Sequence, residues 1–483
     1  MAVTEFLTLI DPGSGGFWAV VYIISAWAIC IGALIVVPFR RSPEAAKGWL
    51  LLFFVAPWPA LLLYQAIGRP THPRWRRQRV AQFQKVFSAN ASRATGALSP
   101  FIVPAPGPAA ALARGIGWMP VLSGNAVEFL PDYDGAIDRL VADIDGAQQH
   151  VHLLFYIFAD DTTGRRVMAA LERAQGRGVT CRVLIDAIGS RRWGRAVMAR
   201  LAAAGIAAHR ILPLRLISYA TRADLRNHRK IAVIDGRTGY AGSQNIIDAA
   251  LPNGQVNREL QVRVQGPIVR QLQVVFAADW FLETEEQLAD PGLPQPPEPA
   301  GTVAIQTLPS GPDLARGSVN DLFIALIAGA RERVVITTPY FVPGETLLQA
   351  MRAAVLRGVQ VDLIVSRRSD AVLVGLAQRS YYADMLACGV RIHLFQPAFL
   401  HAKHMSVDDG TVLIGSSNMD MRSFELNAEV SLVLYDRHAA ERLRAIEGGY
   451  IAEATALDAA AWDARPLPIK VAENVARLMS PLL

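Results

Sequence analysis

The sequence predicts an α/β protein made of two similar halves and preceded by an N-terminal helical hairpin in a membrane. Three observations support this fold class. Two long apolar runs without charge lie near the N-terminus. An order of strand, helix, Arg-Gly-Val and strand occurs twice downstream. The motif His-x-Lys-x4-Asp, followed by Gly-Ser-x-Asn, occurs once in each of these repeats.

Residues 1–70 are expected to anchor the chain in a membrane. The first apolar run, residues 17–39, is long enough for a helix to cross a hydrocarbon layer of about 30 Å. The second run, residues 48–68, contains Pro57 and Pro59. The link between the runs is short, so we expect a hairpin of two spanning helices. A signal peptide is disfavoured because no basic segment precedes the first run. The other alternative is a buried helix of a soluble protein. The prolines favour this alternative more for the second run than for the first.

The distribution of cationic residues predicts the orientation of this hairpin. One group of arginines, beginning at Arg69, follows the second run, and a smaller group of Lys and Arg lies in the link between the two runs. Because cytoplasmic segments carry an excess of Lys and Arg, we expect a multi-pass protein of the cytoplasmic (inner) membrane with its catalytic region on the cytoplasmic face. The larger group can also bind anionic headgroups, or act only as a topology signal. The two groups are Arg69, Arg74, Arg76, Arg77 and Arg79, and Arg40, Arg41 and Lys47.

The composition excludes several classes of protein. The 483 residues allow about three domains. Hydrophobic residues make up 52% and charged residues 19%, which argues against a disordered chain and against a basic protein that coats nucleic acid. The three cysteines, Cys30, Cys181 and Cys388, are far apart and odd in number. They exclude a disulfide framework and a zinc site of the CxxC type.

Downstream of the anchor the chain reads as an internal duplication. Strand-like residues 151–158 and 334–342 open the two repeats. The proline-rich residues 291–303 are expected to link them. The C-terminal tail has apolar residues at helical spacing, which can rest on the bilayer or, as is more common, on the core. The expected divisions are a basic juxtamembrane linker at 71–118, a first half at 119–290, and a second half with the tail at 304–483.

The two motifs are nearly identical. The chain has only five lysines, and two of them belong to these motifs, which indicates that a compact ammonium group is needed at these positions. The first copy consists of His228, Lys230, Asp235, Ser243 and Asn245, and the second of His401, Lys403, Asp408, Ser416 and Asn418.

The motif spacing predicts a β-hairpin that presents polar groups on one face. Residues i and i+2 of a strand face the same way, so His and Lys share a face. A hairpin centred at the motif aspartate would place Ser243 opposite His228, and Ser416 opposite His401. Both aspartates would then lie at turns, and we expect them to be structural more than chemical.

Such a face suits chemistry at a phosphodiester. One imidazole can attack phosphorus while a second protonates the leaving oxygen. Lysines and small polar donors can stabilise charge on the other phosphate oxygens. The sequence shows no cluster of carboxylates with Mg²⁺ or Ca²⁺ spacing. It therefore predicts phosphoryl transfer without a metal or another cofactor.

Each histidine would benefit from an acidic partner. Glu259 and Glu429 both occur in an Asn-x-Glu sequence at a similar distance beyond the Gly-Ser-x-Asn tail. A carboxylate bonded to one ring nitrogen fixes the tautomer, so that the other nitrogen can react. The alternative is that both are surface glutamates.

These residues make the sequence resemble the phospholipase D superfamily, and further stretches resemble bacterial cardiolipin synthases in particular. The resemblance covers nearly the whole chain. It implies two pseudo-symmetric phospholipase D-like halves, each an α/β/α sandwich with a mixed sheet, with both motifs in one site. The stretches are LPSGPD, TPYFVP, GSSNMDMRSFELNAEV and VQGPIVRQLQVVFAADW.

The resemblance also implies an activity. Members of the family condense two phosphatidylglycerol molecules to cardiolipin and glycerol through a covalent phosphatidyl-histidine, at a membrane bilayer. By the same analogy His228 would be the nucleophile, and His401 the acid and then the base. Phosphate would be bound by Lys230, Lys403, Asn245 and Asn418, with Tyr340 in the pocket.

Other functions stay open at this point. The same chemistry with water would make a phospholipase D-type hydrolase, and with another alcohol a different transphosphatidylase. A nuclease is disfavoured because the chain has a membrane hairpin and its arginine cluster lies beside the bilayer, so no nucleic-acid partner is expected. A lipid-binding scaffold without catalysis is disfavoured because both motifs are intact.

Overall fold

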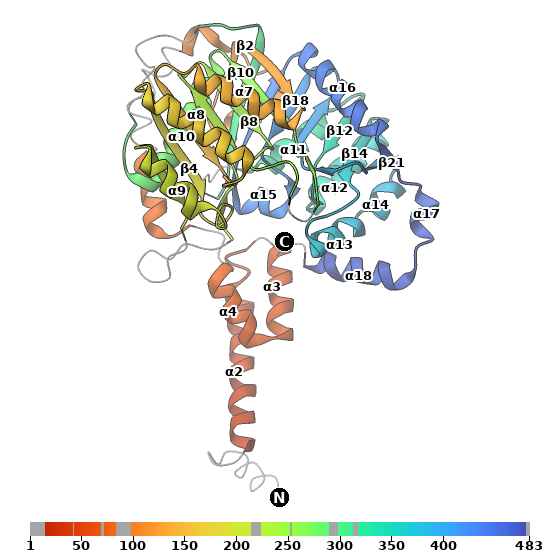
Figure 1. Ribbon diagram of the computed structural model, residues 1–483. Helices are drawn as coiled ribbons and strands as arrows, with labels where there is room; N and C mark the ends of the chain where they lie inside the picture. The colour runs from red at the N-terminus through yellow and green to blue at the C-terminus, as the bar shows by residue number, and fades with distance from the viewer. Residues whose placement is uncertain are drawn as a thin grey trace, which may run out of the picture.

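The computed structural model describes residues 15–41, 43–68, 72–83, 98–213, 224–251, 254–288, 298–312 and 317–479. Figure 1 shows a helical stalk at the N-terminus and a large α/β body. The proline-rich linker expected at 291–303 lies mostly outside the described residues.

The first half of the body is a mixed sheet with the strand order β5-β4-β3-β7-β8-β10-β2. Its first three strands run parallel and the rest antiparallel. Helices α7, α8 and α9 cover one face and α10 covers the other. The elements are β2 (Val121–Leu130), α7 (Tyr133–Asp145), β3 (His150–Phe155), α8 (Thr162–Gly176), β4 (Thr180–Asp186), α9 (Gly194–Ala203), β5 (Ala207–Ile211), β7 (Ile231–Ile234), β8 (Thr238–Gly242), β10 (Gln261–Gln265) and α10 (Ile268–Thr284).

The second half repeats this design, with the order β21-β15-β14-β12-β17-β18-β20-β11. Helices α11, α12 and α13 cover one face and α16 covers the other. The elements are β11 (Val303–Ser310), α11 (Val319–Gly329), β12 (Arg333–Thr337), α12 (Glu345–Leu356), β14 (Gln360–Ser366), α13 (Val372–Ser380), α14 (Tyr382–Ala387), β15 (Arg391–Phe395), β17 (His404–Val407), β18 (Thr411–Gly415), β20 (Asn427–Tyr435), α16 (Arg437–Ala452) and β21 (Ala454–Ala456).

The two halves are joined through their edge strands. Strand β2 pairs with β10 of its own half and with β11 of the second, so one sheet runs through the whole body. Strand β3 is buried on both sides: Leu153 faces the core under α8, whereas Leu154 faces a central core shared with the second half. The central parallel strands therefore read as continuous apolar runs. The expected pair of pseudo-symmetric α/β/α halves with mixed sheets is confirmed.

The stalk differs from the expected pair of spanning helices. Helix α2 (Gly15–Val36) is continuous, and among the described residues it is the one helix long and apolar enough to cross a membrane. The second run instead forms two short antiparallel helices, α3 (Pro43–Val55) and α4 (Pro57–Ile67), which pack on α2. Helix α3 ends at Val55 because Pro57 lacks the N–H group that would continue it. Pro57 starts α4 instead.

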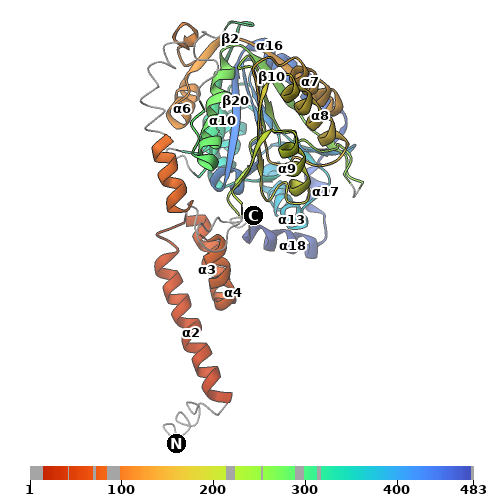
Figure 2. The same ribbon diagram turned by 60° about the vertical axis from the view of Figure 1, so that its left-hand side comes forward.

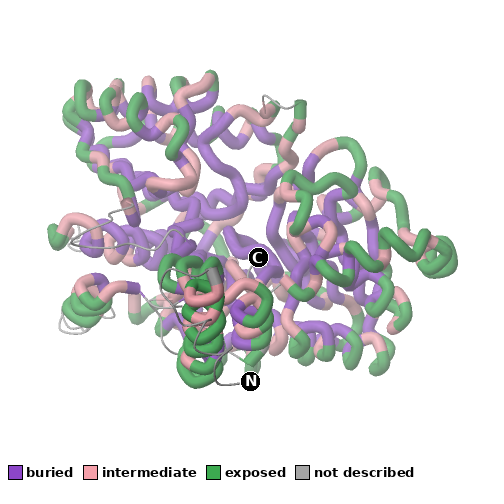
Figure 3. Tube along the Cα trace, turned by 90° about the horizontal axis from the view of Figure 1, so that it is seen from below, coloured by how far each residue is buried: buried purple, intermediate pink, exposed green. Residues whose placement is uncertain are grey.

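The turn between α3 and α4 lies part of the way along α2. Trp58 Nε1 donates to Ser25 Oγ (3.3 Å), and Cys30 Sγ contacts Phe53 O (3.4 Å), while Arg41 donates to Ile67 O at the upper end. The short hairpin therefore descends beside α2 and returns on the side where it began. Figure 2 shows this arrangement from another side, and Figure 3, seen from the stalk, shows the stalk largely exposed and the body buried inside.

Part of the segment expected as a basic linker is folded onto the body. The helical residues 74–83 lie against the end of α10, where Arg76 pairs with Glu283 (2.5 Å) and Arg79 donates to Leu282 O (2.7 Å). These two arginines therefore bind protein. Further on, β1 (Ile102–Val103) pairs with β2, and α6 (Pro108–Gly117) packs on β11.

Candidate active site

Each motif histidine follows a short strand that pairs with a strand of the other half, so the two halves exchange short strands. Before His228, β6 (Arg226–Asn227) pairs in parallel with the start of β20, and His228 N donates to Ala428 O (2.8 Å). Before His401, β16 (Phe399–Leu400) pairs with β9 (Asn257–Arg258), and His401 N donates to Arg258 O (2.7 Å). This exchange brings the two motifs together at one site.

The exchange also gives each histidine a carboxylate from the opposite half. His228 Nδ1 lies 2.9 Å from Glu429 Oε1, and His401 Nδ1 lies 2.7 Å from Glu259 Oε1. Both glutamates are buried, so they are not surface residues. A carboxylate at Nδ1 holds the proton there, which leaves the Nε2 lone pair available.

The two motif serines lie behind the glutamates. Ser416 Oγ donates to Glu429 Oε2 (2.5 Å) and accepts from Val430 N (3.0 Å). Ser243 Oγ accepts from Leu260 N (3.0 Å). Both serines are fully buried and neither lines the cavity described below. Through these bonds they hold the strands that carry the two carboxylates.

Burial controls the protonation of the motif residues. It lowers the pKa of His228 and of His401 below the ordinary value, although the adjoining carboxylate opposes this. For Glu429, burial alone would raise the pKa, but His228 and Lys230 outweigh it and hold the pKa below the ordinary value. Both imidazoles are therefore neutral at neutral pH, with ionised carboxylates behind them.

The two lysines are buried next to the histidines that precede them. Lys230 Nζ donates to His228 O and Lys403 Nζ to His401 O, both at 2.6 Å. Burial lowers the pKa of Lys230 to about 7 and the pKa of Lys403 to about 8. Neither is among the residues that line the cavity. An anion bound between the histidines would stabilise the charged form of both amines.

The motif aspartates lie at the hairpin turns. The Asp235 carboxylate accepts hydrogen bonds from the backbone N–H groups of residues 148–150, at 2.8 to 2.9 Å. The Asp408 carboxylate accepts from those of residues 331–333, at 2.8 to 3.2 Å. Each aspartate thus ties its hairpin to the strand beside it and lies away from the cavity.

The expected hairpin register is wrong by one residue. The turn forms at Asp235-Gly236, since Arg237 N donates to Ile234 O (3.0 Å), but Arg237 stays outside the ladder and Ile234 pairs with Thr238. In the second hairpin Val407 pairs with Thr411 in the same way. The extra loop residue shifts every partner by one, so the serines do not lie opposite the histidines.

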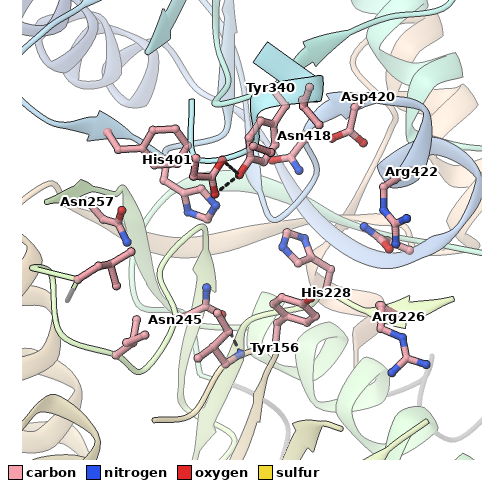
Figure 4. A pocket seen from close by; sticks show the side chains of 18 of the residues that line it. Tyr156, Arg226, His228, Asn245, Asn257, Tyr340, His401, Asn418, Asp420 and Arg422 are labelled. Carbon is pink, nitrogen blue, oxygen red and sulfur yellow. Dashed lines mark hydrogen bonds between the residues drawn. The ribbon is translucent and has the colours of Figure 1, made fainter. Parts of the chain in front are cut away.

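A cavity of about 660 Å³ separates the two histidines. Figure 4 shows His228 and His401 facing each other across it, with Asn245, Asn418, Tyr156 and Tyr340 around them. Asn245 Oδ1 accepts from Ile157 N (3.1 Å), which leaves its amide N–H groups as donors toward a ligand. The wall also carries the charged side chains Arg226, Arg422, Asp370 and Asp420.

Several of these wall residues were not expected from the sequence, whereas Tyr340 was expected in the pocket and lines it. The ring of Tyr156 contacts His228 edge-on, with centroids 4.9 Å apart. The Tyr340 hydroxyl donates to the Asp370 carboxylate (2.7 Å). The internal repeat contained a signal for Tyr156, because it follows β3 much as Tyr340 follows β12. No motif pointed to Asp370 or to Arg226, and Arg422 lies in a stretch that carried the resemblance without a role being assigned to it.

No group of three or more His, Cys, Asp or Glu side chains among the described residues is arranged to hold a metal ion. The two lysines and the two glutamates are hydrogen-bonded to the motif histidines.

Comparison with known proteins finds a matching family model, curated relatives and a solved structure of the same fold. The family model described as "Cardiolipin synthase, PLD-like domain" matches residues 140–280 and 323–446. The chain is 31% identical to cardiolipin synthase A of Pectobacterium atrosepticum, over 96% of this chain and 98% of the relative. It is 32% identical to a cardiolipin synthase of Geobacillus kaustophilus, over 97% and 96%. A solved phosphatidylserine synthase of Haemophilus influenzae shares the fold, with a TM-score of 0.56 and 14% identity, over 78% of this chain and all of that chain.

Proposed function

Because the chain belongs to the cardiolipin synthase family of phospholipase D-like proteins, we propose that it condenses two phosphatidylglycerol molecules into cardiolipin and glycerol. One observation carries the proposal: two histidines face each other across one cavity, and each has a buried carboxylate at Nδ1. This is the arrangement that a two-step displacement at phosphorus requires.

In the first step His228 Nε2 attacks the phosphorus of one phosphatidylglycerol. A P–N bond forms and the P–O bond to the headgroup glycerol breaks. His401, in its protonated form, gives its proton to the leaving oxygen, so free glycerol departs. The anionic phosphodiester raises the pKa of His401 while it is bound, which offsets the effect of burial.

In the second step the neutral His401 accepts the proton of a headgroup hydroxyl of a second phosphatidylglycerol. The hydroxyl oxygen attacks phosphorus, the P–N bond breaks, and cardiolipin leaves with His228 restored. His401 again carries the proton with which it began. Protons and bonds balance over the cycle, and no oxidant, reductant or metal enters it.

Four groups are proposed to stabilise the phosphate charge. Lys230 and Lys403 place ammonium groups beside the two histidines, and the amides of Asn245 and Asn418 line the cavity. Fixed donors in a buried site stabilise developing charge more than they would in water. Asp235 and Asp408 are proposed to act only through the position of the hairpins.

We propose that α2 anchors the enzyme in the cytoplasmic membrane with the body on the cytoplasmic face. Residues 1–16 contain no Lys or Arg. Because the α3–α4 hairpin returns to its starting side, Arg40, Arg41 and Lys47 lie on the same side of α2 as the body. All nearby cations therefore favour one orientation. The hairpin enters the bilayer without crossing it, in place of a second span.

A product assay tests the proposal. The protein in vesicles is given radiolabelled phosphatidylglycerol with EDTA, and the wild type is compared with His228→Ala and His401→Ala. We expect cardiolipin and free glycerol from the wild type and neither from the variants. Phosphatidic acid as the main product would instead show a hydrolase, and turnover only after another alcohol is added would show a different transphosphatidylase. Full activity in either variant would overturn the mechanism.

A further inference from the structure

The C-terminal helix α18 (Leu467–Leu478) exposes its apolar residues. Leu467, Val471, Val475 and Leu478 are 71%, 52%, 58% and 57% exposed. With 3.6 residues per turn, these four positions form one continuous stripe along the helix. The sequence alone favoured packing of this segment on the core, but the stripe does not take part in it.

The opposite side of α18 buries a charged residue. Glu473 is 1% exposed, and its carboxylate binds Arg465 (2.9 Å) and Arg379 (3.0 Å). Ala476 is the other buried residue of this helix. A surface helix of a soluble domain shows the reverse pattern, with apolar residues inside and charges outside. The ion pairs fix the rotation of α18 so that its stripe faces outward.

The exposed stripe continues toward both the stalk and the cavity. A groove of about 320 Å³ is lined by Lys47 and Leu51 of α3 and by Arg477 and Leu478 of α18. On its other side α18 packs on α13, where Val372 and Leu373 are exposed and the adjacent Ala371 and Val374 line the active-site cavity. Figures 1 and 2 show α18 lying across the end of the body from which the stalk projects.

We propose that α18, together with the start of α13, lies in the headgroup layer of the bilayer that α2 enters. The apolar stripe adjoins α3 at the groove, and α3 packs on α2, the helix of membrane-spanning length. Lys47 and Arg477 line the same groove, where anionic headgroups would be. The bilayer is therefore favoured over a second copy of the chain as the partner. This contact holds the cavity mouth against the layer that contains a lipid substrate.

The depth of α18 can be measured without any catalytic step. The full chain with Cys388→Ser and Val475→Cys is labelled with the fluorophore NBD and placed in vesicles of phosphatidylethanolamine and phosphatidylglycerol. Leu478→Cys gives a second position on the stripe. The matched control is Glu441→Cys on α16, which is exposed on the far side of the body (Figure 1). Parent protein without an engineered cysteine gives the background.

We expect lipid-borne nitroxide to quench the labels at 475 and 478 several-fold more than the label at 441, and aqueous iodide to quench them several-fold less. Equal access of iodide to all three labels would overturn the proposal. Protection from both quenchers, with energy transfer between labelled chains, would overturn it in favour of a second copy. Because the readout is depth, it stands even if the proposed activity fails.

Discussion

At the scale of single residues, the site depends on pairs that cross between the halves. Glu429 serves His228 and Glu259 serves His401, so the glutamate of each repeat acts on the histidine of the other. The sequence identified both glutamates, because they recur at the same place in the repeat. It could not assign partners, since the pairing depends on how the halves dock.

Removal of one glutamate charge should slow catalysis more than it weakens binding. In Glu429→Gln the amide can still contact Nδ1, but it no longer stabilises the positive charge that His228 gains on attacking phosphorus. We expect kcat to fall by about 100-fold or more, with KM little changed. The matched variant Ser417→Ala changes a buried side chain beside Ser416 and should keep near-normal kcat. Steady-state kinetics that show only a rise in KM for Glu429→Gln would contradict the role.

The lysines should give activity an alkaline limit. Burial lowers the pKa of Lys230 to about 7 and that of Lys403 to about 8. Below these values the amines are charged and can stabilise phosphate, and above them they lose the proton. We therefore expect kcat/KM, which reports the free enzyme, to fall as pH rises through about 7 to 8. The acid limb should lie below 6.5, because attack needs a neutral His228 and burial lowers the pKa of this imidazole to about 4. His401 must carry a proton in the first step, so its lowered pKa adds to the fall on the alkaline side. A profile that stays flat to about pH 9 would contradict this assignment.

At the scale of elements, the hairpins show what a motif can and cannot specify. The motif spacing predicted a turn at the aspartate, and the turn forms there. The predicted register was wrong because one further loop residue stays outside the ladder. The sequence did not indicate this residue, since strands that are buried on both faces have no alternating apolar pattern that would fix the register. The two prolines in the second apolar run indicated the break between α3 and α4. The length of the run, taken alone, had predicted a second membrane-spanning helix.

The turn aspartates should matter for stability in proportion to their backbone contacts. Asp408→Ala removes the acceptor of three backbone N–H groups, and we expect a loss of about 2–4 kcal/mol in the free energy of unfolding. Asp409→Ala in the same loop removes only a surface pair with Arg444 and should cost no more than about 1 kcal/mol. Denaturant unfolding of the two variants checks this, and equal losses would contradict the structural role.

At the scale of the whole molecule, one chain holds the entire site. Strand β2 joins the sheets, a central core is shared, and each histidine is bound by the backbone of the other half. The duplication, the fold class and the convergence of the motifs could all be expected from the repeats and from the family resemblance. The charged part of the cavity wall could not, because Arg226 and Asp370 come from positions that no motif marks.

A mixing experiment tests whether the site is formed within one chain. Purified His228→Ala and His401→Ala proteins are combined in the same vesicles, each chain having one intact motif. Because both motifs of a site come from the same chain, we expect the mixture to stay as inactive as its components. Recovery of about a quarter or more of wild-type activity would show that sites are shared between chains.

The most direct test of the central claim separates the nucleophile from the acid. A phosphatidyl ester of p-nitrophenol needs no proton on its leaving oxygen, so attack by His228 does not require His401. We predict that His401→Ala releases one equivalent of p-nitrophenol per enzyme and then stops, with the phosphatidyl group bound to His228. We predict no release from His228→Ala. A burst from His228→Ala and none from His401→Ala would contradict the assigned roles, and release that continues without a burst in both would contradict the covalent mechanism.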